Sequence, residues 1–142
     1  MPTSARSALS LVDTSAAVAF LVADHEYHDV VFGLLASRQL GLARHAAFET
    51  FSVLTRLPPP ARRTPAAVSR LLVSNFPQSR FLSAERAARP LSELADHGIA
   101  GGTVYDALVG ATAVEHDLSL VSRDRRALEV YRELGADVEM IR

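Results

Sequence analysis

Four carboxylates stand at points of this sequence where their side chains could act together. Asp106 lies in the small and apolar stretch G-G-T-V-Y-D-A-L-V-G-A-T-A-V, on the helical face that carries Val109 and Gly110. The polar Thr112 and Glu115 are expected towards the other side of that helix. Burying an ionised carboxylate without compensation is costly, so Asp106 needs a cation, hydrogen-bond donors or a metal. The other acids at the starts of predicted elements are Asp13, Glu49 and Asp124.

Acids of this kind, if the fold brings them together, predict a site for a hard metal ion. Neighbouring carboxylates repel one another, which raises their pKa values and destabilises the fold unless a cation neutralises them. Oxygen ligands favour Mg²⁺ or Mn²⁺ over zinc. Such an ion lowers the pKa of a bound water and stabilises charge on phosphorus oxygens, so the set is suited to phosphodiester hydrolysis.

Each acid also has a purely structural explanation. Asp13 and Asp124 could be helix N-caps, and Thr103 with Asp106 fits the spacing of a capping box. Glu49 could be an ordinary solvated glutamate on a helix. Their convergence at one place in the fold would favour the metal site, so the elements that carry them decide between the two explanations.

The elements that must position these acids alternate between strand and helix. Strands are predicted at 9–12, 41–43, 80–82, 118–121 and 138–141, and helices at 16–23, 28–38, 46–57, 64–75, 83–96 and 124–134, with a further helix around Asp106. The prolines 58–60 end the third helix, because proline lacks the amide donor. The alternation predicts an α/β fold with a parallel sheet and helices on both faces. Ligands bind such sheets at the carboxyl ends of the strands, where Asp13 and Asp124 stand.

Composition excludes several classes of protein. The 142 residues are 49% apolar, which suits a single domain over 1–142 with its own core. The absence of cysteine excludes thiolate metal sites, cysteine nucleophiles and disulfides. All 15 basic residues are arginines, so a P-loop or Schiff-base lysine is excluded, and a phospho-accepting receiver domain, which relies on a lysine, is disfavoured.

The charge and hydropathy patterns indicate a protein that acts away from membranes. The net charge of -1 gives no global reason to bind nucleic acid or a membrane surface. The apolar stretch at 16–23 is far shorter than the roughly 20 residues that span a bilayer. We therefore expect a cytoplasmic protein. Arg123, Arg125 and Arg126 flank Asp124 and are candidates to contact the phosphates of a substrate, because arginine presents a planar fork of donors.

The ordered acidic motifs resemble those of the PIN-domain nucleases, most closely the VapC-type toxins of bacterial toxin-antitoxin modules. The matching segments are L-V-D-T-S-A, A-x-x-E-x-x-x-V-L, Y-D-A-L-V-G-A-T-A and L-V-S-R-D-R-R, which together span residues 9–126. The resemblance implies a three-layer α/β/α sandwich with a mostly parallel central sheet. It also implies a metal-dependent endoribonuclease that uses Mg²⁺ or Mn²⁺, a cognate antitoxin protein that occludes the site, and a homodimer.

The resemblance also assigns roles to individual residues. Asp13 and Asp106 match the two main metal ligands, and Glu49 and Asp124 match the acids that complete the pocket. The hydroxyl residues expected to support the site are Thr14, Ser15 and Ser122. A catalytically silent PIN-like module, in which the pocket only engages a partner protein, is the alternative, and the presence of all four acids argues against it.

Overall fold

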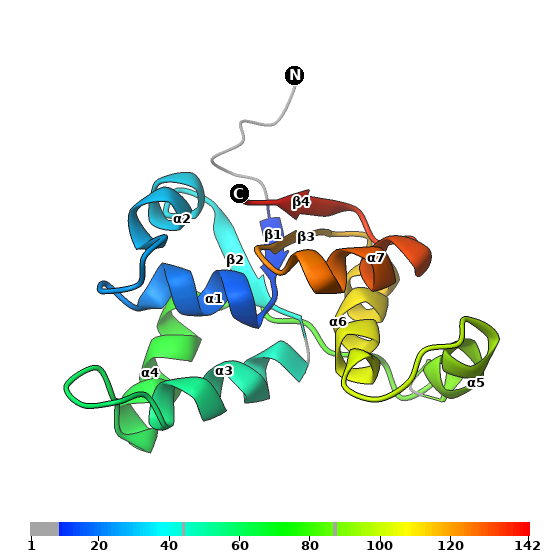
Figure 1. The fold of residues 1–142 in the computed structure, drawn as a ribbon, viewed down its shortest axis with the longest axis horizontal. Coiled ribbons are helices and arrows are strands. Elements are labelled where there is room, and N and C mark those ends of the chain that lie inside the picture. Colours follow the sequence, from blue (N-terminus) through cyan, green and yellow to red (C-terminus); the bar gives the residue numbers. More distant parts are fainter. Residues whose placement is uncertain (1–8, 44, 87) are drawn as a thin grey trace.

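The structure, a computed structural model, describes residues 9–43, 45–86 and 88–142. Figure 1 shows its strands and helices along the chain. They are β1 (Leu9–Val12), α1 (Thr14–Leu21), α2 (His28–Leu35), β2 (Gln39–Leu42), α3 (His45–Thr55), α4 (Pro65–Asn75), α5 (Arg89–Asp96), α6 (Thr103–Glu115), β3 (Ser119–Ser122), α7 (Arg125–Glu133) and β4 (Val138–Met140). This alternation confirms the predicted α/β class.

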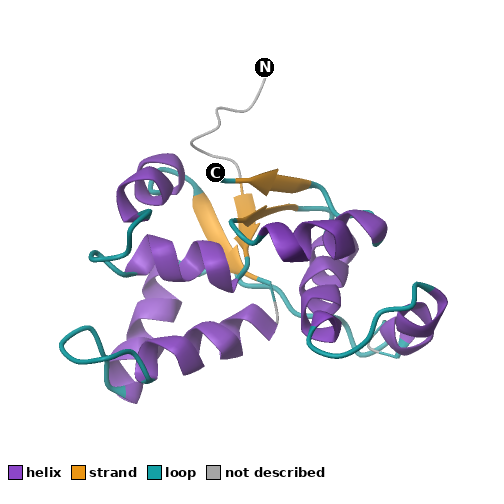
Figure 2. Ribbon diagram, viewed as in Figure 1, coloured by secondary structure: helices purple, strands orange, loops and turns teal. Residues whose placement is uncertain are grey.

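The strands form one sheet in the order β2-β1-β3-β4, and every pair of neighbours in it is parallel. Parallel strands are joined by helical crossovers and buried on both faces, which explains their apolar sequences. Figures 1 and 2 show the helices packed around these strands, in the three-layer α/β/α sandwich that was expected. In the centre of the sheet, Val12 of β1 lies opposite Val121 of β3. The carboxyl ends of these two strands therefore lie side by side.

Local sequence signals account for several helix boundaries. Thr64 caps α4, because its hydroxyl accepts a hydrogen bond from the N–H of Ala67 at 3.2 Å, and Pro65 occupies the first turn. Helix α3 ends at Thr55, ahead of the prolines as predicted. Helix α2 ends at Leu35, earlier than predicted. None of the helices within the described ranges is both long and apolar enough to cross a bilayer.

The segment after α4 runs along the outer edge of β2 without becoming a strand of the sheet. The N–H of Arg80 donates to the carbonyl of Leu42 at 3.0 Å, and that of Gln78 to Leu40 at 3.1 Å. Over the described residues, the strand predicted at 80–82 is reduced to an isolated bridge between Ala43 and Arg80. The two backbones approach so closely at Gly41 that a Cβ there would overlap the carbonyl of Gln78. Only glycine fits this position of β2.

The helix predicted over 83–96 is wrong in its first half, since α5 begins only at Arg89. Pro90 lies in the first turn of α5. A proline there lacks the N–H that an extension of the helix towards residue 83 would need. The helix therefore starts late, and the residues before it are free to make contacts with the rest of the fold.

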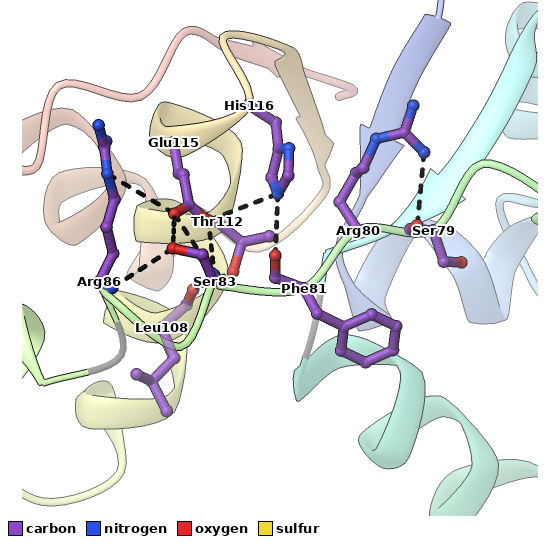
Figure 3. Close-up of polar contacts among 9 residues, drawn as sticks. All are labelled: Ser79, Arg80, Phe81, Ser83, Arg86, Leu108, Thr112, Glu115 and His116. Carbon is purple, nitrogen blue, oxygen red and sulfur yellow. Dashed lines mark hydrogen bonds and ion pairs between the residues drawn. The ribbon is translucent and has the colours of Figure 1, made fainter.

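Those residues are held against the C-terminal end of α6 by a group of polar side chains (Figure 3). The N–H and hydroxyl of Ser83 donate to the carboxylate of Glu115 at 3.0 and 2.6 Å. Nε2 of His116 donates to the carbonyl of Phe81 at 2.8 Å. The guanidinium of Arg86 stands 3.7 Å from Glu115. This Glu115 cluster fixes the connection between the edge of the sheet and α5.

Candidate active site

The four acids singled out by the sequence line one cavity at the carboxyl ends of β1 and β3. Its volume is about 40 Å³, enough for roughly three water-sized spheres. The lining residues are Asp13, Thr14, Ser15, Glu49, Asp106, Val109, Asp124 and Tyr131. The structure thus places the predicted carboxylates together, although they come from distant parts of the chain.

The fold explains this convergence. Asp13 directly follows β1 and caps α1, and Asp124 follows β3 and caps α7. Asp106 lies in the first turn of α6. The N-termini of three helices therefore point towards the same cavity, and their partial positive charges favour the carboxylates gathered there. Glu49 is supplied by α3, the helix that follows β2.

Asp13 is the most thoroughly hydrogen-bonded acid of the site. Its Oδ1 accepts from the Ser15 hydroxyl at 2.6 Å and from the N–H of Ala16 at 3.1 Å. Its Oδ2 accepts from the Ser122 hydroxyl at 2.5 Å and the Tyr131 hydroxyl at 2.8 Å. Burial raises the pKa of Asp13, and these four hydrogen bonds act in the opposite direction by stabilising the ionised form. Asp13 therefore is an N-cap of α1 and also lines the cavity.

The three hydroxyl residues expected to support the site, Thr14, Ser15 and Ser122, all donate hydrogen bonds to its acids. The Thr14 hydroxyl donates to the Glu49 carboxylate at 3.1 Å, which ties α1 to α3. The Ser122 hydroxyl accepts from the N–H of Asp124 at 3.0 Å while it donates to Asp13. Ser122 therefore joins the two acids at the ends of the central strands, and it is fully buried.

Asp106 differs from Asp13 in having little compensation from the protein. The capping-box explanation is wrong, because Gly102 occupies the N-cap position and the Thr103 hydroxyl donates to the carbonyl of Ala100 at 2.7 Å. Burial is the main cause that raises the pKa of Asp106 to about 6, and the charges of Asp124, Glu49 and Asp13 contribute to that rise in this order. This acid therefore experiences an excess of negative charge in the cavity.

The helix that carries Asp106 is buried on the predicted face. Val109 and Gly110 are both buried. Thr112, which was expected on the other side, is buried as well, and its hydroxyl donates to the carbonyl of Leu108 at 2.8 Å (Figure 3). That internal hydrogen bond satisfies the hydroxyl and lets threonine serve as a core residue.

An aromatic contact links the two helices that carry Glu49 and Asp106. The rings of His45 on α3 and Tyr105 on α6 are stacked, with their centroids 4.6 Å apart. Nε2 of His45 also stands 3.9 Å from Glu49. This stack joins α3 to α6 outside the cavity lining.

Tyr131 is a site residue that sequence reasoning missed. It lies on α7 four residues after Ala127, on the buried face of that helix. The charge of Asp13 and the burial of the phenol raise the pKa of Tyr131 far above its ordinary range, so the hydroxyl stays protonated and acts as a donor. Helix α7 is capped by Asp124, and the helical spacing of its buried residues, Ala127 and Tyr131, is a sequence signal that could have indicated the position of Tyr131.

The three candidate arginines have different surroundings. The guanidinium of Arg123 lies over the ring of Tyr27, 3.8 Å from its centroid, in a cation–π contact. Its backbone N–H donates to the Ser15 hydroxyl at 2.8 Å. Arg125 and Arg126 are exposed, and Arg126 stands 3.8 Å from Asp124. Arg123 is thus engaged within the fold, whereas Arg126 lies beside Asp124 and Arg125 is exposed.

The donor set fits Mg²⁺ or Mn²⁺ bound largely through water. Within the described ranges, no group of three or more histidine, cysteine, aspartate or glutamate side chains is close enough to hold a metal by itself. Mg²⁺ commonly binds through one or two carboxylates and keeps several of its waters. A cavity with room for waters, hard oxygen donors and a raised Asp106 pKa suits that mode.

Comparisons with known proteins identify the family of the chain. The PIN domain family matches residues 10–133. The chain is 42% identical to Ribonuclease VapC27 of Mycobacterium tuberculosis over 127 residues, covering 89% of this chain and 93% of that protein. It is 44% identical to Ribonuclease VapC40 of the same species over 131 residues, covering 91% of this chain and 96% of the relative.

A solved structure shares the fold at lower sequence similarity. It is VapBC2 from Rickettsia felis bound to a DNA fragment from its promoter, with a TM-score of 0.65 and 14% identity over 94% of this chain and 99% of that one. That likeness concerns the fold, whereas the curated relatives cover most of both sequences at much higher identity. The chain belongs to the PIN-domain family and, within it, to the VapC ribonucleases.

Proposed function

We propose that this protein is a metal-dependent endoribonuclease that acts as the toxin of a type II toxin-antitoxin system. The observation that carries the proposal is the convergence of Asp13, Glu49, Asp106 and Asp124 on one cavity. The similarity to VapC27 and VapC40, both named as ribonucleases, supports RNA as the substrate. The donor set supports Mg²⁺ or Mn²⁺ as the cofactor.

The residues of the site have different roles in hydrolysis. A divalent ion, when bound, would supply a water of lowered pKa and stabilise charge on the scissile phosphate. Asp13 and Asp106 would hold that ion, and Glu49 and Asp124 would position the ion or the attacking water. Four donors fix the orientation of the Asp13 carboxylate before substrate arrives. Asp106 accepts no hydrogen bond from the described part of the protein, so its lone pairs are open to the cavity.

The rim of the cavity gives the RNA backbone a place to bind. Arg125 and Arg126 are exposed beside Asp124, so their charges offset the acids when a phosphate approaches. Substitution of either arginine should weaken RNA binding. Arg123 has the same charge, but its guanidinium is committed to Tyr27.

The proposal includes the expected partners. The VapBC2 neighbour is a toxin-antitoxin complex, which supports a cognate antitoxin for this chain as well. We also propose a homodimer and a cytoplasmic location, where RNA is accessible. Copurification with a small protein encoded beside this reading frame, followed by loss of RNA cleavage in the complex, would test the antitoxin directly.

Cleavage of total RNA by the purified protein tests the activity. We expect cleavage with Mg²⁺ or Mn²⁺, none with EDTA, and recovery when the ion is restored. Asp106→Asn should abolish cleavage, whereas Asp137→Asn, at an exposed position outside the cavity, should leave it unchanged. Cleavage by the wild type with EDTA and by Asp106→Asn at the level of the wild type with Mg²⁺ would contradict the mechanism. Binding of partner protein without any Mn²⁺ binding would instead favour a silent interaction module.

A further inference from the structure

The carboxylate of Asp13 has no acceptor position left over for a metal ion in this arrangement. An ionised carboxylate offers about four lone-pair positions, two on each oxygen. Ser15 and the N–H of Ala16 occupy those of Oδ1, and Ser122 and Tyr131 occupy those of Oδ2. One of these donors must therefore withdraw before Asp13 can be a direct ligand.

The position of the cavity indicates which of the four hydrogen-bond donors to Asp13 can withdraw. Ser15 and Tyr131 line the cavity, whereas the Ser122 side chain is fully buried away from it. The N–H of Ala16 belongs to the first turn of α1 and is fixed by that helix. An ion that enters from the cavity side therefore meets the hydrogen bonds of Ser15 and Tyr131 first.

These two donors differ in what their withdrawal would cost. The Ser15 hydroxyl also accepts the backbone N–H of Arg123 at 2.8 Å, so moving it would break a second hydrogen bond. The Tyr131 hydroxyl makes a single hydrogen bond within the described residues, the one to Asp13. Tyr131 is therefore the donor whose release disturbs the site least.

We propose that Tyr131 is a positioning residue that controls access to Asp13: its O–H holds the cavity-facing lone pair of Oδ2 and releases it when a divalent cation binds. This inference rests on the metal dependence proposed above. The Tyr131 ring is only 1% exposed and faces Gly110, where an added Cβ would lie 3.2 Å from its Cδ1, so the ring has little room to move. Release therefore requires the Asp13 carboxylate to turn towards the cation, which moves Oδ2 away from the phenol oxygen. Without the cation, the same hydrogen bond keeps Asp13 in its binding orientation.

Calorimetric titration of Mn²⁺ into the full chain tests this role. Tyr131→Phe removes the competing donor, so we expect it to bind Mn²⁺ about tenfold more tightly than wild type, equivalent to about 1.4 kcal/mol. Tyr105→Phe removes the same hydroxyl from an exposed ring beside the site and should bind within about twofold of wild type. Unchanged or weaker binding by Tyr131→Phe would overturn the inference while leaving the proposed function standing. If neither protein binds Mn²⁺, both fail.

Ser122→Ala tests whether tighter Mn²⁺ binding requires the loss of the cavity-facing donor, Tyr131, or follows the loss of any hydrogen-bond donor to Asp13. It also removes a hydrogen bond to Oδ2, but the freed lone pair faces the interior, so no tightening is expected. A gain equal to that of Tyr131→Phe would contradict the proposed control by Tyr131. If Tyr131 had only a structural role, Tyr131→Phe would have a lower free energy of unfolding and would not bind Mn²⁺ more tightly.

A spectroscopic measurement on the wild type covers the case in which Tyr131→Phe fails to fold. Release of the phenol from a carboxylate changes its near-ultraviolet absorption, so Mn²⁺ should produce a tyrosine difference spectrum. The signal should persist in Tyr105→Phe, whose remaining tyrosines are Tyr27 and Tyr131. It should also persist in Tyr27→Phe. A wild-type protein that binds Mn²⁺ without any tyrosine difference signal would overturn the inference.

Discussion

Gly110 on α6 and Tyr131 on α7 are in direct contact, because a Cβ placed on Gly110 would lie 3.2 Å from Cδ1 of the Tyr131 ring. This close approach lets the Tyr131 hydroxyl reach Asp13 at 2.8 Å. The packing of two helices outside the cavity thus determines how one acid of the site is held. The absence of a side chain at Gly110 is part of the geometry of the site.

Gly110→Ala should destabilise the protein even though alanine is the better helix former. The new methyl group must push on a ring that is buried and tied to Asp13, so we expect a loss of about 1–2 kcal/mol in the free energy of unfolding. Gly33→Ala on α2 is the matched control, since a Cβ there meets nothing within 4 Å. It should gain up to about 1 kcal/mol. Urea denaturation measures both, and equal stabilisation of the two variants would contradict the packing argument.

Asp106→Asn should stabilise the metal-free protein at neutral pH. The pKa of Asp106 is raised from 3.8 to about 6, so its ionised form is disfavoured in the folded state. Between these pH values the folded protein binds more protons than the unfolded chain, and stability therefore falls as pH rises. The gain from Asp106→Asn should be absent below pH 4, grow up to about pH 6 and then level off. After allowance for partial solvent screening we expect about 1–2 kcal/mol.

Thermal unfolding from pH 4 to pH 8 measures that gain. Asp137→Asn, at an exposed position, is the control and should show no such pH profile. Saturating Mg²⁺ should reverse the order, because the wild type gains binding energy that the variant lacks. A gain at pH 7 that equals the gain at pH 4 would show that the ionisation of Asp106 is not its cause.

The sequence predicts those parts of the acidic site that depend on where an acid stands relative to a predicted strand or helix. Asp13 and Asp124 directly follow predicted strands, and the carboxyl ends of parallel strands meet at one edge. The contact of Tyr131 with Asp13 joins residues 118 positions apart and depends on helix packing at Gly110, which leaves no periodic signal. The capping box predicted from Thr103 and Asp106 does not form, because Gly102 occupies the N-cap position of α6.

The main error in the predicted elements also has a tertiary cause. Residues from 83 onwards have a helix-compatible sequence, but Ser83 is bonded to Glu115 across 32 positions. A contact of that separation outweighs local propensity and cannot be read from the segment itself. The same reasoning applies at the sheet edge, where Arg80 follows the backbone of β2 only as an isolated bridge.

Gly41→Ala should be strongly destabilising. A Cβ at this position would overlap the carbonyl of Gln78, and backbone atoms cannot move aside as a flexible side chain can. Either β2 or the segment at 78–80 must shift, which would break the hydrogen bonds that Leu40 and Leu42 accept from that segment. We expect a loss of about 3 kcal/mol or more. Chemical denaturation alongside Gly33→Ala checks this, and a loss below 1 kcal/mol would contradict the close approach.

Glu115→Gln should loosen the connection to α5 without affecting the metal site. The amide nitrogen of glutamine would face the N–H or the hydroxyl of Ser83, which both donate to the carboxylate (Figure 3). These hydrogen bonds lower the pKa of Glu115, so they favour its ionised form. The amide hydrogen of Ser83 should therefore exchange faster with solvent in the variant. Glu129→Gln, on an exposed position of α7, should leave that exchange rate unchanged.

Glu115→Gln also tests whether the two ends of α6 act independently of each other. Glu115 lies nine residues after Asp106, which corresponds to about 13 Å along the helix axis. The Glu115 cluster therefore holds one end of α6 while the acids of the cavity surround the other. Mn²⁺ affinity and RNA cleavage should be unchanged in Glu115→Gln when exchange at Ser83 has increased. A parallel loss of Mn²⁺ binding would instead show that this connection controls the placement of Asp106.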